Sequence, residues 1–150
     1  MRIQIKKNFK VLYFGALLAI TNFSYAACSI NSTSFAFGAY NPLSGQSKTS
    51  SAMILVSCTE DRTLIMTLSS GNSGVFSPRR MLNGSQKINY NLYLDSSFNN
   101  IFGDGTSGTN LYKGIVGTSL VSIPVYGLIP ANQNVSVGQY NDLINITLFF

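Results

Sequence analysis

Residues 144–150 read Ile-Asn-Ile-Thr-Leu-Phe-Phe, and apolar side chains occupy every second position of this stretch at the end of the chain. Successive side chains of a β-strand point to opposite faces, so alternate residues share one face. The pattern therefore predicts a strand with one face in a core and the other turned away from it. The residues expected to line that core are Ile144, Ile146, Leu148 and Phe150.

The same two-residue period recurs upstream, and no segment carries the stripe of an amphipathic helix. Alternating strands are expected over 64–68 and 88–95, with further strands near 33–40 and 120–129. The continuous apolar run 52–56 predicts a strand buried on both faces. Within 120–129, Pro124 would mark a sheet edge or a bulge. Turn-forming clusters separate these stretches, at 41–42, 71–74, 83–84, 103–108 and 131–134.

Short strands divided by such turns predict an all-β fold, an immunoglobulin-like Greek-key β-sandwich. About six strands are evident in the pattern, whereas an immunoglobulin-like sandwich has about seven. Two interpretations remain open. Either one strand escapes the pattern, or the sandwich is incomplete.

The first 26 residues have the parts of a secretory signal. Four basic residues precede or flank an apolar stretch over 11–20, and Ser24-Tyr25-Ala26 then supplies the small residues that precede a cut. We expect cleavage after Ala26 and one exported domain over residues 27–150. The apolar stretch of about ten residues is too short to cross a bilayer, which takes about 20, so no integral membrane span is expected.

The chain has two cysteines, Cys28 and Cys58, and cysteine pairs persist outside the cytoplasm. We expect them to form a disulfide, which would contribute about 3.7 kcal/mol in the chain-entropy model. One alternative is a pair of free thiols. Another is a lipoprotein modified at Cys28, although Tyr25 stands where such a site usually has Leu, and Cys58 would then lack a partner.

Composition excludes several classes of function. The formal net charge of +5 falls to +1 over residues 27–150, which keep six basic and five acidic residues. Arg79-Arg80 is the one basic cluster there, so nucleic-acid binding is not expected. The chain has no histidine, and Glu60-Asp61, its adjacent carboxylates, would point to opposite faces of a strand. The 103–108 segment matches G-x-G-x-x-G without the strand and helix that a nucleotide site needs. We expect no catalytic site, metal site or cofactor.

Six segments of the chain occur in a distinctive order and spacing. They are Phe37-Gly38-Ala39-Tyr40-Asn41-Pro42, Val56-Ser57-Cys58-Thr59, Arg80-Met81 with residues 90–95, Gly103-Asp104-Gly105-Thr106, residues 124–127 with 129–131, and Gly138-Gln139-Tyr140-Asn141-Asp142. Together they resemble the spore coat protein U domain found in secreted pilins of the archaic, Csu-like chaperone–usher class, and the resemblance covers essentially all of 28–150. One departure is Phe102, where the family pattern leads us to expect Trp.

The resemblance implies an incomplete sandwich whose missing strand is lent first by a periplasmic chaperone. A neighbouring pilin subunit then replaces that strand at an outer-membrane usher. It also implies passage through the periplasm to the cell surface or beyond, with Ile144, Ile146, Leu148 and Phe150 lining the acceptor groove. Cleavage after Ala26 would leave Ala27 alone before Cys28, too short to donate a strand. We therefore expect a tip or terminal fibre subunit.

An adhesin and a stand-alone secreted coat protein are the alternatives. Long apolar loop tips would favour the adhesin. The candidate loops, 71–78 and 97–110, consist mostly of Gly, Ser and Asn, so they give that function little support.

Overall fold

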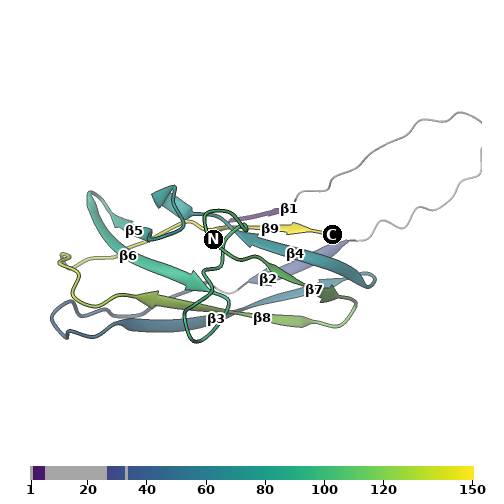
Figure 1. Ribbon diagram of the computed structural model, residues 1–150, viewed down its shortest axis with the longest axis horizontal. Coiled ribbons are helices and arrows are strands. Elements are labelled where there is room, and N and C mark those ends of the chain that lie inside the picture. The colour runs from purple at the N-terminus through teal and green to yellow at the C-terminus, as the bar shows by residue number, and fades with distance from the viewer. Residues whose placement is uncertain (1, 6–26, 33) are drawn as a thin grey trace, which may run out of the picture.

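The computed structural model describes residues 2–5, 27–32 and 34–150, and in these ranges the chain folds as two facing β-sheets (Figure 1). A single 3-10 turn, η1 (Gly71–Ser73), interrupts the strands. The strands are β1 (Arg2–Ile5), β2 (Cys28–Ser32), β3 (Lys48–Cys58), β4 (Arg62–Leu68), β5 (Arg79–Asn83), β6 (Gln86–Tyr93), β7 (Tyr112–Val116), β8 (Val121–Ile129) and β9 (Asn145–Phe149).

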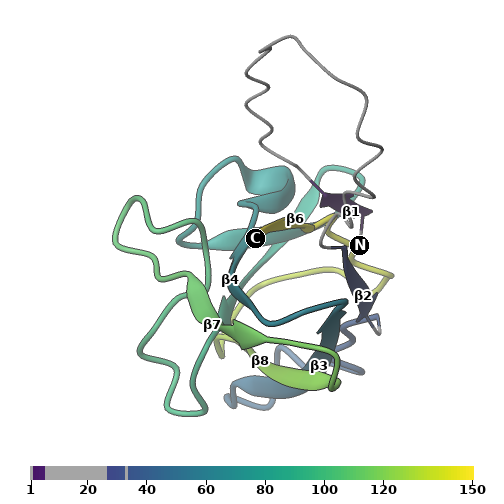
Figure 2. The same cartoon turned by 90° about the vertical axis from the view of Figure 1, so that its right-hand side faces the viewer.

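One sheet has the order β1-β9-β4-β7 and the other β2-β3-β8-β6-β5. Every pairing between these strands is antiparallel except that of β1 with β9, which is parallel. Figure 2 shows β3 and β8 running together along one side of the molecule. The predicted fold class is confirmed: the protein is an all-β, immunoglobulin-like sandwich.

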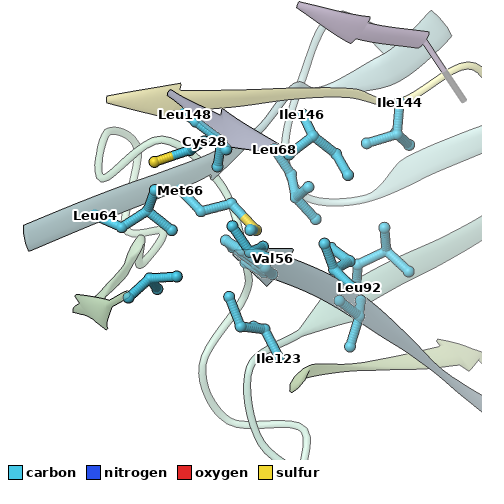
Figure 3. Close-up of a cluster of buried hydrophobic side chains, with 14 of the residues drawn as sticks. Cys28, Val56, Leu64, Met66, Leu68, Leu92, Ile123, Ile144, Ile146 and Leu148 are labelled. Carbon is cyan, nitrogen blue, oxygen red and sulfur yellow. The ribbon is translucent and has the colours of Figure 1, made fainter. Parts of the chain in front are cut away.

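The core lies between the sheets and is built by alternate residues of the facing strands. Leu64, Met66 and Leu68 of β4 are buried, as the period-2 pattern predicts. In β9 and just before it, the inward residues Ile144, Ile146 and Leu148 are buried, Phe150 is half-buried, and Phe149 is 38% exposed. Figure 3 shows Ile144, Ile146 and Leu148 on the side of β9 that faces Leu68, Val56 and Leu92.

Two strand predictions are wrong in an informative way. The 52–56 run is not buried on both faces, because Met53 is 47% exposed whereas Ile54 is 3% exposed. Its sheet packs against the other sheet on one side only. The strand expected near 33–40 is not seen in its described part, 34–40, and a strand the pattern did not predict, β2, lies just before it. The alternation there is real, since Phe35 and Phe37 pack on the core, but the segment has no ladder partner.

Two further expectations concern local features. Pro124 lies inside β8 at a point where β3 alone pairs with it, because β6 pairs only with Tyr126–Leu128, so its position is locally an edge. The turn predicted at 83–84 closes the β5–β6 hairpin one residue later, with Gly84 and Ser85 between the paired residues Asn83 and Gln86. The alternation pattern missed both β5 and β7.

The predicted disulfide is present. Cys28 stands directly opposite Cys58 in the β2–β3 ladder, and their sulfur atoms are bonded. The remaining signal prediction falls largely on residues 6–26, which lie outside the described residues. Among the described residues, no helix is long and apolar enough to cross a membrane.

Candidate functional site: the outer edge of β9 and the adjoining pocket

The strand β9 has a different kind of neighbour on each side. On one side it pairs with β4 through residues 146–149, so this side is completed by the body of the domain. On the other side Asn145–Leu148 pairs in parallel with Arg2–Ile5 of β1 (Figure 1). Since β1 belongs to the predicted signal, the outer edge of β9 is a site where an added strand forms a regular ladder.

A pocket of about 790 Å³ opens beside the start of β9. Its floor is the core surface, including Ile54, Leu92 and Ile144. Two long connections form its sides: residues 34–47 lead from β2 to β3, and residues 130–144 lead from β8 to β9. We call residues 34–40 wall one and residues 135–142 wall two. Connections of this length without secondary structure are uncommon in a small domain and are often functional.

Wall one is held down by its aromatic rings. The rings of Phe35 and Phe37 meet edge to face with centroids 5.0 Å apart, and Phe37 meets Tyr90 of β6 in the same way at 5.7 Å. Both phenylalanine rings lie over Gly127, where a Cβ atom would come within 2.5 Å of Phe35 and 2.7 Å of Phe37. A glycine at this inward position of β8 therefore makes room for the wall.

Wall two is held by hydrogen bonds at its end. The Tyr90 hydroxyl donates to Asp142 Oδ2 at 2.6 Å. The backbone N–H groups of Asn72 and Leu143 donate to Asp142 Oδ1 at 2.7 and 2.8 Å. Burial, reinforced by this hydrogen bond and the Asp142 charge, raises the pKa of Tyr90, so its hydroxyl stays protonated and available as a donor. Asp142 thus ties wall two to β6 and to η1.

The far ends of the two connections are joined to each other and to β6. The Tyr40 hydroxyl donates to Pro130 O at 3.0 Å and accepts from the Gln133 N–H at 3.3 Å. The Gln133 side-chain amide both accepts from the Asn89 N–H at 2.7 Å and donates to Asn89 O at 2.8 Å. This amide completes the edge of β6 as a neighbouring strand would.

The backbones of the two walls are largely unpaired. Within the described part of the chain, the backbone groups of residues 34–39 have one protein partner, the Ser50 hydroxyl on Ala36 O. Those of residues 135–139 likewise have one, the Tyr140 hydroxyl on Ser136 O. Unpaired backbone groups beside an apolar pocket are what an additional strand requires.

The chemistry of the pocket favours an apolar chain over a charged ligand. Asp142 is the one charged residue among the described residues that line it, and its carboxylate already accepts three hydrogen bonds. No group of three or more His, Cys, Asp or Glu able to hold a metal occurs among the described residues. The 103–108 segment is a turn whose carboxylate, Asp104, accepts from the N–H and hydroxyl of Thr106, and these bonds lower the pKa of Asp104.

The sequence profile of the Spore Coat Protein U domain matches residues 15–147. The chain belongs to the spore coat protein U domain family. A comparison with individual proteins finds a relative, Protein U of Myxococcus xanthus, which is 33% identical over 142 residues. The match covers 83% of this chain and 78% of that protein. The resemblance inferred from the quoted segments is therefore confirmed.

This spore coat protein U domain also has the fold of a chain in a solved chaperone–subunit complex. A chain in the crystal structure of the CsuC–CsuE chaperone–tip adhesion subunit pre-assembly complex, from archaic chaperone–usher Csu pili of Acinetobacter baumannii, superposes with a TM-score of 0.60. The two share 16% sequence identity, and the match covers 84% of this chain and 40% of the other. Our chain thus spans less than half the length of that protein, and the similarity establishes the shared fold.

The structure brings the predicted groove residues of this spore coat protein U domain together along one face of β9 and its flanks. Ile144 lies at the junction with the pocket, and Ile146 and Leu148 lie where β1 pairs. Sequence reasoning missed both walls and the Asp142 hydrogen bonds. A signal existed for each, since Phe35 and Phe37 alternate, and Asp142 closes a segment that resembles the family.

Arg79 is a second feature that sequence reasoning missed. It is fully buried rather than part of a surface basic cluster, and burial lowers the pKa of its guanidinium. Its Nε and Nη2 donate to Ser69 O at 3.0 and 2.9 Å, Nη2 also donates to Phe102 O at 2.6 Å, and Nη1 donates to Asn91 Oδ1 at 2.7 Å. Arg79 therefore joins its own sheet to the end of β4, away from the groove.

Proposed function

We propose that this protein is a structural subunit of a secreted surface fibre, completed by a strand that another chain adds at the outer edge of β9. The observation that carries the proposal is the position of β1. A segment of the predicted export signal occupies the edge of β9, while the apolar pocket beside it remains open. Removal of the signal would leave both the edge and the pocket available to a donor strand.

The energetics support a requirement for such a donor. An exposed apolar side chain forgoes about 1.5–3 kcal/mol relative to a buried one. Ile144, Ile146 and Leu148 are buried while β1 is paired with β9. Any of them that lost its cover together with β1 would weaken a domain whose whole stability is about 5–15 kcal/mol. An uncovered strand edge is also a template for pairing with other chains. The exported domain alone is therefore expected to be poorly stable or to self-associate.

The partners we propose follow from the family and from the similar fold in a chaperone–subunit complex. A periplasmic chaperone would complete the fold first, an outer-membrane usher would then receive the subunit, and another pilin would supply the final strand at the cell surface. Cleavage after Ala26 would leave Ala27 alone ahead of Cys28, so this subunit accepts a strand without donating one. We accordingly place it at the tip or end of the fibre, with a structural rather than catalytic role.

The proposal is tested on the exported protein, with its signal removed and its disulfide formed. The protein is diluted from denaturant with or without a synthetic peptide of about ten residues that alternates valine and threonine, a common length for a strand. We expect a soluble monomer with the peptide and loss of monomer without it, measured by gel filtration with light scattering. A scrambled peptide of the same composition, with its valines clustered, is the control. A stable monomer that ignores the peptide would instead identify a self-contained coat protein.

A further inference from the structure

We propose that Asp142, acting through Tyr90, is the positioning residue that holds the pocket open for an incoming strand. This inference rests on the proposed function, since it concerns the regulation of the same groove. Tyr90 lies on the pocket floor, and it contacts both walls. Its ring meets Phe37 of wall one, and its hydroxyl meets Asp142 of wall two. The Tyr90–Asp142 pair therefore sets the distance between the walls.

The surroundings of Asp142 are built to keep its carboxylate in one place. Gly71, at the start of η1, has a φ of +67°, and a Cβ atom there would lie 2.3 Å from Asp142 Oδ2 and 2.6 Å from Oδ1. The carboxylate thus occupies the volume that any other residue at position 71 would need. Next to it, Asn141 exchanges backbone hydrogen bonds with Leu82 of β5, at 2.8 and 3.0 Å. Both contacts anchor the same end of wall two.

The consequence concerns binding rather than overall stability. The rest of wall two, residues 135–140, has no ladder partner among the described residues. Its position therefore depends on its core contacts and its two ends, which are held by the Gln133 hydrogen bonds on one side and by Asp142 on the other. If the wall moves, only the fraction of molecules with an open pocket can accept a strand. The apparent affinity for the strand is then the intrinsic affinity multiplied by that fraction. A preformed pocket removes this cost before the strand arrives.

The first measurement uses the full chain, in which β1 pairs with β9, and needs no donor strand. Amide hydrogen exchange is followed at the Asn141 N–H, whose acceptor is Leu82 O. Tyr90→Phe removes one hydrogen bond to a charged group, so we expect exchange at Asn141 to accelerate about tenfold. Exchange in the β3–β8 ladder should not change. Unchanged exchange at Asn141 would overturn the proposal, whatever the result with a donor peptide.

The second measurement compares strand capture by variants of the exported protein, with the valine–threonine peptide as the probe. Asp142→Ala should slow capture at least tenfold, and Tyr90→Phe about tenfold. Asp142→Asn should remain within about threefold of the unmodified protein, because its Oδ1 still accepts both backbone N–H groups and its amide still reaches Tyr90. The matched control is Asp95→Ala, which removes another turn-forming carboxylate that accepts from Asn99 and Asn100 N–H, away from the pocket.

The outcomes separate this inference from the proposed function. Capture by the unmodified protein tests the function, and the ratio of Asp142→Ala to Asp95→Ala tests the positioning role. Equal slowing in both variants would reduce Asp142 to an ordinary stabilising residue. If the unmodified protein captures no peptide, the function fails, and the exchange experiment alone still decides whether Asp142 fixes wall two.

Discussion

The β3–β8 ladder and the outer side of β9 are made of similarly apolar strands but are completed in different ways. β3 and β8 pair over nine consecutive positions, and both strands have further neighbours within the domain. β9 has four paired positions on its outer side, all with β1. We call the first region the closed half and the second the open half. The side chains of the two regions are similar, so backbone pairing is what distinguishes them, and the proposed function assigns the less paired edge to a partner strand.

The largest expected effect comes from a substitution on the buried face of β9, in the open half. Ile146→Asp places a charge on the buried face of β9, and we expect it to cost about 5 kcal/mol or more, because lost apolar burial adds to the cost of an unpaired buried charge. Such a loss is enough to prevent rescue by a donor peptide. Thr147→Asp, on the opposite face, is the control and should retain rescue. Monomer recovery by gel filtration distinguishes the two, and equal recovery would show that β9 does not line the groove.

The disulfide tests the closed half. Reduction, or replacement of Cys28 and Cys58 by serine, should lower the free energy of unfolding by about 3.7 kcal/mol. The bond joins β2 to β3 and lies outside the pocket lining, so the peptide-complemented protein should still bind its peptide at low denaturant. Urea titrations of the complemented protein with and without reductant provide the measurement. A change below about 1 kcal/mol would contradict the assigned role of the bond.

Arg79 offers a sharper test, because its neighbour in sequence is a matched control. Arg79→Met leaves the buried acceptors Ser69 O and Phe102 O unpaired, and we expect a loss of about 3 kcal/mol. Arg80 is half-buried, with one long hydrogen bond to Asn89, so Arg80→Met should change stability by less than about 0.5 kcal/mol. Thermal unfolding of the complemented proteins compares them. Similar losses would mean that Arg79 does not join the sheets.

Alkaline pH tests the burial of Tyr90, on β6 between the two walls. Its pKa is raised above the ordinary value of 10.0, so the stability it contributes is fully present below pH 10.0 and is lost as the pH rises further. We expect the complemented protein to lose stability above about pH 10 more steeply than its Tyr90→Phe variant. Unfolding midpoints from pH 8 to 11 test this. Parallel curves would contradict burial of the phenol.

The smallest expected effect on stability concerns Asp104, which belongs to neither half. The hydrogen bonds from Thr106 lower the pKa of Asp104 below its ordinary value of 3.8, so its contribution is present above that pH and is lost as the pH falls further. Asp104→Asn should therefore give a slightly flatter decline in stability below about pH 4. Its peptide capture at neutral pH should equal that of the unmodified protein. A loss of capture would extend the site to the 103–108 turn.

The sequence allowed the faces of individual strands to be predicted, but it did not reveal contacts between residues far apart in the chain. The faces of β9 were predictable because alternation from Ile144 to Phe150 depends only on adjacent residues. The Cys28–Cys58 pair followed from there being two cysteines in an exported chain. Burial of both faces of 52–56 was wrong, since residue type does not reveal whether a second layer covers a sheet.

The site itself depends on contacts that the pattern does not encode. Residues 34–40 alternate as a strand does, yet they form none because no strand lies beside them. Asp142 has partners 70 and 52 residues away, Asn72 and Tyr90, and the spacing of the sequence does not predict them. Arg79 looks like a surface cation beside Arg80 until the two sheets close around it.

The β1–β9 pairing has a consequence for how much of this protein a cell can export. Under the proposed function, a chain that loses β1 with its signal would meet either a donor strand or another copy of itself. Encounters with the donor rise in proportion to the subunit concentration, whereas encounters between bare copies rise with its square. Doubling subunit synthesis at a fixed donor supply therefore favours mutual pairing over assembly. On that proposal, the ratio in which subunit and donor are produced would set the yield of usable protein.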